Sequence, residues 1–172
     1  MKKLVLLLSA TVLLYSCKHK PEDIIAKKWH ATELSSPQMD QMMVEQQQFL
    51  DTFGKNSDAA SNKLAYGVED VDSMRRSLQL QMNDFKAMQE HAVKNTWFDI
   101  RKNGVAVMNF SGQIDSANWY FDDEKNLVLD EMKLKGTGAK LIMEVVELAD
   151  TSMKLRFTED GVTSAVTFHP EK

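Results

Sequence analysis

Cys17 has the most reactive side chain in this sequence, and it is the only cysteine among 172 residues. It follows an apolar run at residues 4–15, which is preceded by Lys2 and Lys3. A cysteine thiolate is a soft nucleophile that can take up a lipid group as a thioether. An apolar run of this length behind a cationic start is typical of an export signal, and it is shorter than the roughly 20 residues of a membrane-spanning helix. The sequence therefore predicts an exported chain, and Cys17 is its one thiol nucleophile.

The other side chains that could catalyse a reaction or bind a metal show no recognisable spacing. The four histidines are scattered: His19, His30, His91 and His169. The seven glycines are also dispersed and form no phosphate-binding loop. Three acids, Asp99, Asp115 and Glu131, could face one another inside a barrel, but nothing in their spacing brings them together. We expect no catalytic residues, no metal site and no cofactor.

The charge balance argues against nucleic acid as a partner. The chain has 25 acidic and 21 basic side chains, for a net charge of −4. It lacks the clusters of Lys and Arg with which proteins bind nucleic acids. A single cysteine also excludes a disulfide within the chain, so packing alone must stabilise the fold. Without an export signal, about 150 residues remain, which suffices for one domain with its own core.

From residue 37 to about residue 95, the apolar pattern has the period of amphipathic helices. The first predicted helix ends near Gly54, and the second starts near Val68. The segment between them is either a loop or a short helix of its own. A helical turn is also expected at residues 21–28, because Pro21 followed by two acids suits the first turn of a helix.

On both sides of these helices the pattern has period two, which is typical of β-strands. One strand is predicted before the helices and seven after them: residues 29–34, 97–101, 105–110, 117–121, 127–134, 139–148, 153–158 and 162–168. Eight short strands joined by tight turns predict a mainly β fold. We expect an antiparallel barrel of about eight strands or a strongly rolled sheet, with a two-helix insert between the first and second strands.

Two groups of large apolar side chains are candidates for ligand binding. Trp29, Trp97 and Trp119 either pack the barrel core and plug its ends, or line a cavity. Methionines gather on the predicted helices and include Met42 and Met82. They either pack the helices on each other or on the barrel, or form an adaptable surface for apolar partners, because methionine is flexible and polarisable. These five residues are the candidate ligand contacts.

The end of the apolar run, Leu14-Tyr15-Ser16-Cys17, resembles the lipobox of bacterial lipoproteins. The match lies in Leu14, the small Ser16 and Cys17, whereas Tyr15 is bulkier than usual. The resemblance implies that residues 1–16 are removed as a signal peptide. Cys17 then carries acyl chains such as palmitate and anchors the chain in a membrane. The alternative is an ordinary secretory signal in which Cys17 is incidental. Residues 17–23 are expected to form a tether, and residues 24–172 the folded domain.

The chain also resembles the small lipocalin-like domains of Bacteroidetes-type lipoproteins. The resemblance rests on Lys27-Lys28-Trp29, on residues 98–104 and on Trp119. In that family the first strand opens with Gly-x-Trp, and a Phe-x-x-x-Gly strand pair precedes a second tryptophan. Lys27 departs from the family glycine, and the helical segment is larger than usual. Its position is similar to that of the helix pair capping the barrel mouth in fatty-acid-binding proteins. The resemblance implies a barrel that is packed shut or holds one small ligand.

These observations predict a membrane-anchored, non-enzymatic binding module for a small apolar ligand. The alternative is an interaction protein that uses the Met-rich helical insert as a protein-partner surface. The residues after Cys17, Lys18-His19-Lys20, lack the acidic run that resembles a surface-export tag in that bacterial group. We therefore expect a lipid-anchored protein of the cell envelope, at the outer membrane with its domain in the periplasm.

Overall fold

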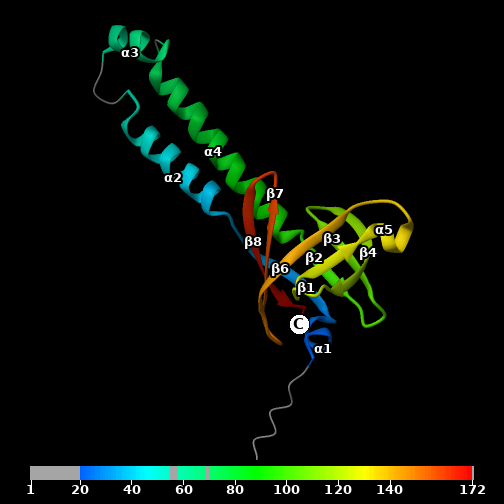
Figure 1. The fold of residues 1–172 in the computed structure, drawn as a ribbon. Helices are drawn as coiled ribbons and strands as arrows, with labels where there is room; N and C mark the ends of the chain where they lie inside the picture. Colours follow the sequence, from blue (N-terminus) through cyan, green and yellow to red (C-terminus); the bar gives the residue numbers. More distant parts are fainter. Residues whose placement is uncertain (1–19, 55–57, 69, 172) are drawn as a thin grey trace, which may run out of the picture.

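Eight strands form one closed antiparallel barrel, in which each strand pairs with its sequence neighbours and β8 pairs back with β1 (Figure 1). The computed structural model describes residues 20–54, 58–68 and 70–171, so Cys17 and the predicted export signal lie outside the described residues. The predicted mainly β fold with an eight-stranded antiparallel barrel is confirmed. The strands are β1 (Lys28–Ser35), β2 (Trp97–Ile100), β3 (Val105–Phe110), β4 (Gln113–Phe121), β5 (Leu127–Asp130), β6 (Lys140–Leu148), β7 (Met153–Glu159) and β8 (Val162–Pro170).

One predicted strand, at residues 127–134, is wrong in its second half. β5 ends at Asp130, and α5 (Glu131–Lys135) follows at once. The Asp130 carboxylate accepts a hydrogen bond from the backbone N–H of Lys133 at 2.8 Å, which caps the start of the helix. Gly136 then adopts φ of 79°, a left-handed conformation that ends helices and that glycine adopts without steric cost. Local capping therefore overrides the alternating pattern.

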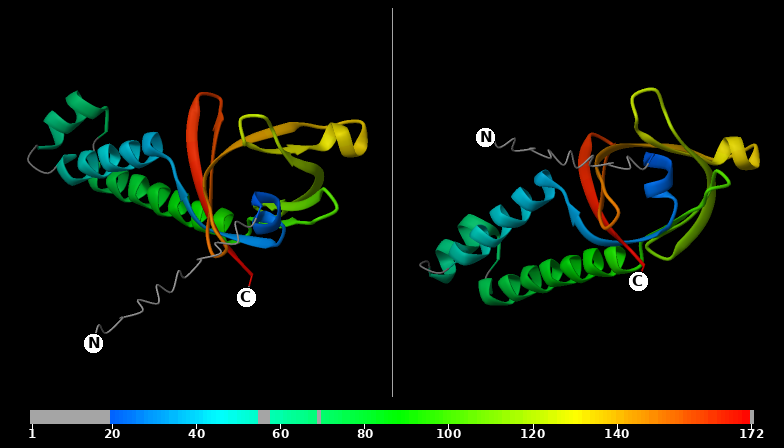
Figure 2. Two further views of the ribbon diagram at one scale, coloured as in Figure 1. Left: turned by 60° about the horizontal axis from the view of Figure 1, so that its bottom comes forward. Right: turned by 90° about the horizontal axis from the view of Figure 1, so that it is seen from below.

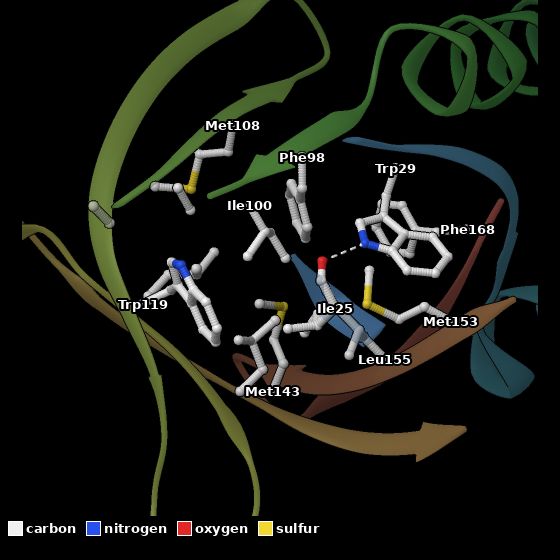
Figure 3. Packing of buried hydrophobic residues seen from close by; sticks show 14 of the residues in the cluster. Ile25, Trp29, Phe98, Ile100, Met108, Trp119, Met143, Met153, Leu155 and Phe168 are labelled. Carbon is white, nitrogen blue, oxygen red and sulfur yellow. Dashed lines mark hydrogen bonds between the residues drawn. The ribbon is translucent and has the colours of Figure 1, made fainter. Parts of the chain in front are cut away.

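Part of the barrel core lies beside α1 (Pro21–Ile25), and Figure 3 shows Ile25, Trp29, Ile100, Trp119 and Met153 among its side chains. Trp29 is fully buried there, and its indole N–H donates to the backbone carbonyl of Ile25 at 2.8 Å. Trp119 is 8% exposed, and its indole N–H donates to the carbonyl of Arg101 at 2.7 Å. A buried indole needs such an acceptor to avoid an unsatisfied donor. We call this the closed end of the barrel; it comprises Ile25, Trp29, Ile100, Trp119, Leu127 and Met153.

The helices between β1 and β2 stand away from the barrel as an arm (Figures 1 and 2). The helical arm consists of α2 (Pro37–Thr52), α3 (Ala59–Tyr66) and α4 (Val71–Lys94). Between the two long helices the sequence allowed either a loop or a short helix, and the structure has the helix α3 there. The Asp58 side chain caps its start. With 24 residues at a rise of about 1.5 Å each, α4 is about 36 Å long.

The tip of the arm has a small apolar cluster of its own. Phe53 is 1% exposed, and its ring lies between those of Phe49 and Tyr66, with centroid distances of 4.9 and 4.5 Å. Val71 at the start of α4 packs close to Gly54, where a side chain would collide with it. None of these residues belongs to the barrel core cluster. The arm and the barrel therefore have separate hydrophobic cores.

The arm joins the barrel where β1 and β2 diverge. β1 pairs with β2 only from Lys28 to His30, but it pairs with β8 as far as Ser35. The C-terminal part of α4 packs against β1 in the resulting gap, and Val93 contacts the barrel core. Gln38 at the start of α2 accepts a hydrogen bond from the backbone N–H of Thr163 at 3.2 Å, which ties α2 to β8.

Candidate functional site

A cavity of about 570 Å³ occupies the barrel at the end opposite the closed end. On β5, Leu127 packs in the closed end, whereas Leu129, two residues further on, lines the cavity. On β7, Met153 packs in the closed end, and Leu155 and Phe157 line the cavity. The same strands therefore build a solid end and a hollow end. The volume falls within the roughly 300–1,000 Å³ typical of small-molecule sites.

The wall of the cavity is predominantly apolar. Its floor consists of side chains that are at most 3% exposed: Phe98, Met108, Leu129, Met143, Leu155 and Phe168. Nearer the mouth, Phe110 and Leu34 line the cavity and are 41% and 37% exposed. Two carboxylates, Glu131 and Glu159, are the ionisable groups among the lining residues. An apolar floor below a partly exposed mouth suits the apolar part of a ligand that keeps a polar end near solvent.

The helical arm completes one side of this wall. Ala92 and Val93 at the end of α4, with Thr96 just after it, line the cavity where β1 and β2 no longer pair. The backbone N–H of Ala31 donates to the carbonyl of Thr96 at 2.9 Å, which fixes the end of the helix against β1. The insert is therefore part of the cavity wall as well as a projection from the barrel.

A second hollow of about 520 Å³ lies outside the barrel, between residues 31–34 of β1 and the C-terminal part of α4. Charged and polar side chains, among them Lys86, Glu90 and Lys94, line it. Each of these three is exposed. This groove has neither the depth nor the apolar floor of the barrel cavity, so we assign the candidate ligand site to the barrel.

The five residues predicted as ligand contacts do not line the barrel cavity. Trp29 and Trp119 pack the closed end of the barrel, and Trp97 lies on the outer face, with Lys28 Nζ 5.2 Å from its ring centroid. Met82 is 2% exposed on the arm, whereas Met42 is 48% exposed. The residues that do line the cavity follow from the alternation of side chains along the strands. The inward positions of β2, β3 and β5 include Phe98, Met108 and Leu129.

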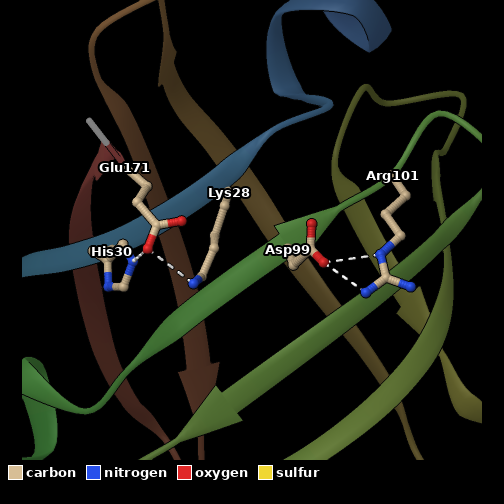
Figure 4. A network of polar contacts seen from close by, with 5 residues as sticks. All are labelled: Lys28, His30, Asp99, Arg101 and Glu171. Atoms are coloured by element: carbon tan, nitrogen blue, oxygen red, sulfur yellow. Dashed lines mark hydrogen bonds and ion pairs between the residues drawn. The ribbon is translucent and has the colours of Figure 1, made fainter.

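Asp99, Asp115 and Glu131, the three acids considered as a possible group inside the barrel, each have a different partner. Asp99 forms an ion pair with Arg101 on the outer face, with 2.7 Å between Oδ2 and Nη2 (Figure 4). Asp115 forms an ion pair with Lys135 of α5. Glu131 Oε2 accepts a hydrogen bond from the backbone N–H of Ala139 at 3.1 Å. These three acids therefore form no common site.

A polar network on the outer face joins β1 to Glu171, which follows β8 (Figure 4). Glu171 Oε1 lies 2.9 Å from Lys28 Nζ and 3.3 Å from His30 Nε2. The hydrogen bond from Lys28, with a smaller contribution from that of His30, outweighs the desolvation and holds the pKa of Glu171 below its usual value of 4.5. The network ties the chain end to β1. In the described part of the chain, no group of three or more His, Cys, Asp or Glu side chains is arranged to hold a metal ion.

Comparison with known proteins finds no matching family, no matching curated protein and no matching solved structure. Within the described residues, none of the helices combines the length and the apolar composition needed to cross a membrane.

Proposed function

We propose that this chain binds a small, mainly apolar ligand in its barrel, as a binding module and not as an enzyme. The observation that carries the proposal is the apolar cavity of about 570 Å³ with its half-exposed mouth. Well-packed interiors contain few voids larger than a water molecule, so an apolar hollow of this size is unusual unless it is filled. Burying the apolar part of a ligand contributes about 25 cal/mol for each Å² removed from water.

Leu141 and Ile142 offer a matched test, because they are neighbours on β6 with opposite orientations. Leu141 lines the cavity, whereas Ile142 is 49% exposed on the outer face. Leu141→Trp should fill the cavity and abolish the fluorescence gain of a neutral naphthylamine probe, while Ile142→Trp should bind the probe like the wild type. Because free space is already present, Leu141→Trp should also avoid the roughly 1–3 kcal/mol cost of overpacking. Undiminished probe binding by Leu141→Trp would refute the cavity as the site.

We further propose that Cys17 carries a lipid anchor, which holds the protein at the outer membrane with its domain in the periplasm. Lys20 precedes α1 at the closed end of the barrel. Three residues span at most about 11 Å, so an anchor on Cys17 would keep the closed end near the bilayer. The cavity mouth and the helical arm would then point away from it. Cys17→Ala should lose palmitate labelling and membrane partitioning; retention of both would refute the anchor.

A second candidate function is that of an interaction protein, and the outer apolar side of the helical arm favours it. Met42 and Phe49 on α2 are 48% and 45% exposed, and Met74 and Met88 on α4 are 36% and 67% exposed. A helix turns by about 100° per residue. Around the axis of α2, Met42 and Phe49 therefore lie about 80–100° from the buried Leu50, and around the axis of α4, Met74 and Met88 lie about 80–120° from the buried Met82, in the same rotational sense. In antiparallel helices, equal offsets place both pairs on one side of the arm, which we call the apolar side of the arm.

A second copy of the chain is the partner that this side fits. The arm projects away from the barrel (Figure 2), so two arms can pair about a twofold axis as a four-helix bundle with each barrel outside the bundle. Met88→Glu should then shift the mass measured by light scattering from dimer to monomer. Leu80→Glu is the matched control, because Leu80 is 62% exposed on the far side of α4. A monomeric wild type would exclude this assembly.

A further inference from the structure

We infer that the barrel cavity selects an amphiphile with a positively charged head group, of the kind given by a protonated amine on a single apolar chain. The inference rests on the proposed function of the cavity and adds the class of head group that its mouth accepts. The juxtaposition that carries it is a pair of carboxylates, Glu131 and Glu159, which line the same apolar cavity as Phe110 and Phe157.

The structure holds Glu131 in place at the mouth. Its backbone N–H donates to the carbonyl of Ala139 at 3.0 Å, and its Oε2 accepts from the N–H of Ala139 at 3.1 Å. Gly138 has φ of 112°, and any side chain at that position would overlap the Glu131 carboxylate. Glycine therefore makes room for this carboxylate. In the described structure the second oxygen, Oε1, has no hydrogen bond or ion pair.

Glu159 reaches the same mouth from the end of β7. Alternation along this strand places it on the side of Leu155 and Phe157, which line the cavity, whereas Arg156 points outward and pairs with Glu144. Glu159 is exposed and forms no ion pair with a described residue. The two glutamates flank the start of β6, so both charges face an incoming head group.

Three lysines near α5 and the start of β6 have partners outside the cavity. Lys135 pairs with Asp115. The ammonium groups of Lys133 and Lys140 lie 4.8 and 5.8 Å from the ring centroid of Tyr120 on the outer face. The lining residues themselves include no Lys, Arg or His. The charged groups that line the cavity are therefore both negative.

This arrangement discriminates between head groups. A carboxylate head would meet two like charges without a cation to offset them, which disfavours its binding. An ammonium head is attracted by both carboxylates, and the aromatic rings among the lining residues also attract cations through their quadrupole. The apolar chain contacts the same floor in both cases, so the head group decides the preference.

Three ligands of equal chain length test the inference: dodecylamine, dodecanol and dodecanoate. Each competes with a neutral naphthylamine probe at pH 7 and low salt, on the purified full chain. Dodecylamine should compete about tenfold more tightly than dodecanoate, with dodecanol between them. In the double variant Glu131→Gln/Glu159→Gln this ratio should fall towards one. Glu144→Gln, which removes the same charge from the outer face, should keep it.

The outcomes separate the two levels of the proposal. Equal competition by the three ligands, tighter binding of dodecanoate, or an unchanged ratio in the double variant would overturn the charge selectivity and leave the cavity as the binding site. Absence of any binding, including that of the neutral probe, would overturn the proposed function as well. A fall of the ratio as salt is added would support the electrostatic origin, because exposed charges are screened.

Discussion

The barrel and the helical arm handle their apolar side chains differently. In the barrel, the closed end places Trp29, Ile25 and Leu127 at zero exposure, and the outward positions are largely polar. In the arm, Phe53 and Met82 are just as buried, yet Met88 is 67% exposed. A sheet that closes on itself shields the inward positions below its open mouth. A helix pair can bury only one stripe of each helix, so apolar residues beside that stripe stay in contact with water.

This difference indicates two units with separate stabilities. The arm contacts the barrel core cluster through Val93, and the cluster at its tip is distant from the barrel. Local units with few shared buried contacts open independently of the global fold. The three tryptophans, Trp29, Trp97 and Trp119, all belong to barrel strands, so tryptophan fluorescence reports on the barrel. Helical circular dichroism at 222 nm reports mainly on the arm.

The largest effect should come from Trp29→Ala in the closed end. Removing a fully buried indole costs about 3–5 kcal/mol, and it also leaves the Ile25 carbonyl without its donor. Urea unfolding followed by fluorescence of the remaining tryptophans would measure the loss. Trp97→Ala is the control on the outer face and should cost much less. Equal losses in the two variants would contradict the assignment of Trp29 to the core.

Phe53→Ala should have the next largest effect, of about 3 kcal/mol, and it should be confined to the arm. Phe53 is 1% exposed between two aromatic rings of the arm tip. We expect a lower melting temperature at 222 nm with an unchanged barrel transition by fluorescence. Phe49→Ala, which truncates a side chain that is 45% exposed, should change the helical signal less. A parallel shift of both transitions would show that arm and barrel unfold as one unit.

Acid should weaken the arm through the cap of α4. Hydrogen bonds from the side chain and then the backbone N–H of Ser73 hold the pKa of Asp70 below its usual value of 3.8. The charged cap therefore stabilises the fold above pH 3.8, and its contribution is lost as the pH falls through the lower, folded-state pKa. Asp70→Asn keeps an acceptor oxygen but does not titrate. Above pH 3.8 the arm of the wild type, followed at 222 nm, should be more stable than that of this variant, and the difference should disappear below pH 3.8. A difference that does not change with pH would contradict the prediction.

The smallest effect should come from Leu64→Ser in α3. Leu64 is 91% exposed, so its removal uncovers no buried surface. Both transitions should stay within about 0.5 kcal/mol of the wild type. A clear destabilisation would mean that this leucine is covered in solution, in favour of a partner on the arm.

Much of the fold was predictable from local pattern. Period-two runs located the eight strands, since inward and outward positions alternate in a barrel wall. The pattern failed at residues 131–135, where the apolar alternation continues but Asp130 and Gly136 cap a helix turn. Asp130 and Gly136 are typical capping residues, but the strand pattern of the same segment favoured the wrong prediction.

The candidate site was harder to predict, because side-chain size does not show which end of a barrel is filled. Trp29 and Trp119 are the largest inward residues, and their bulk closes one end instead of lining the hollow end. Medium-sized residues such as Leu129, Leu141 and Val166 leave the space for a ligand. The strand predicted at residues 153–158 stops short of Glu159, whereas β7 includes Glu159 and brings it to the mouth.

The sequence by itself determined the strands and the two long helices, though not α5, since these follow from periodicity within short windows. It also singled out Cys17, whose predicted role follows from local chemistry alone. Tertiary structure decided the closure of β8 onto β1, the gap that α4 covers, and the place where the barrel stays hollow. These features depend on contacts between residues up to about 140 positions apart, such as Trp29 with Pro170, which no local pattern contains.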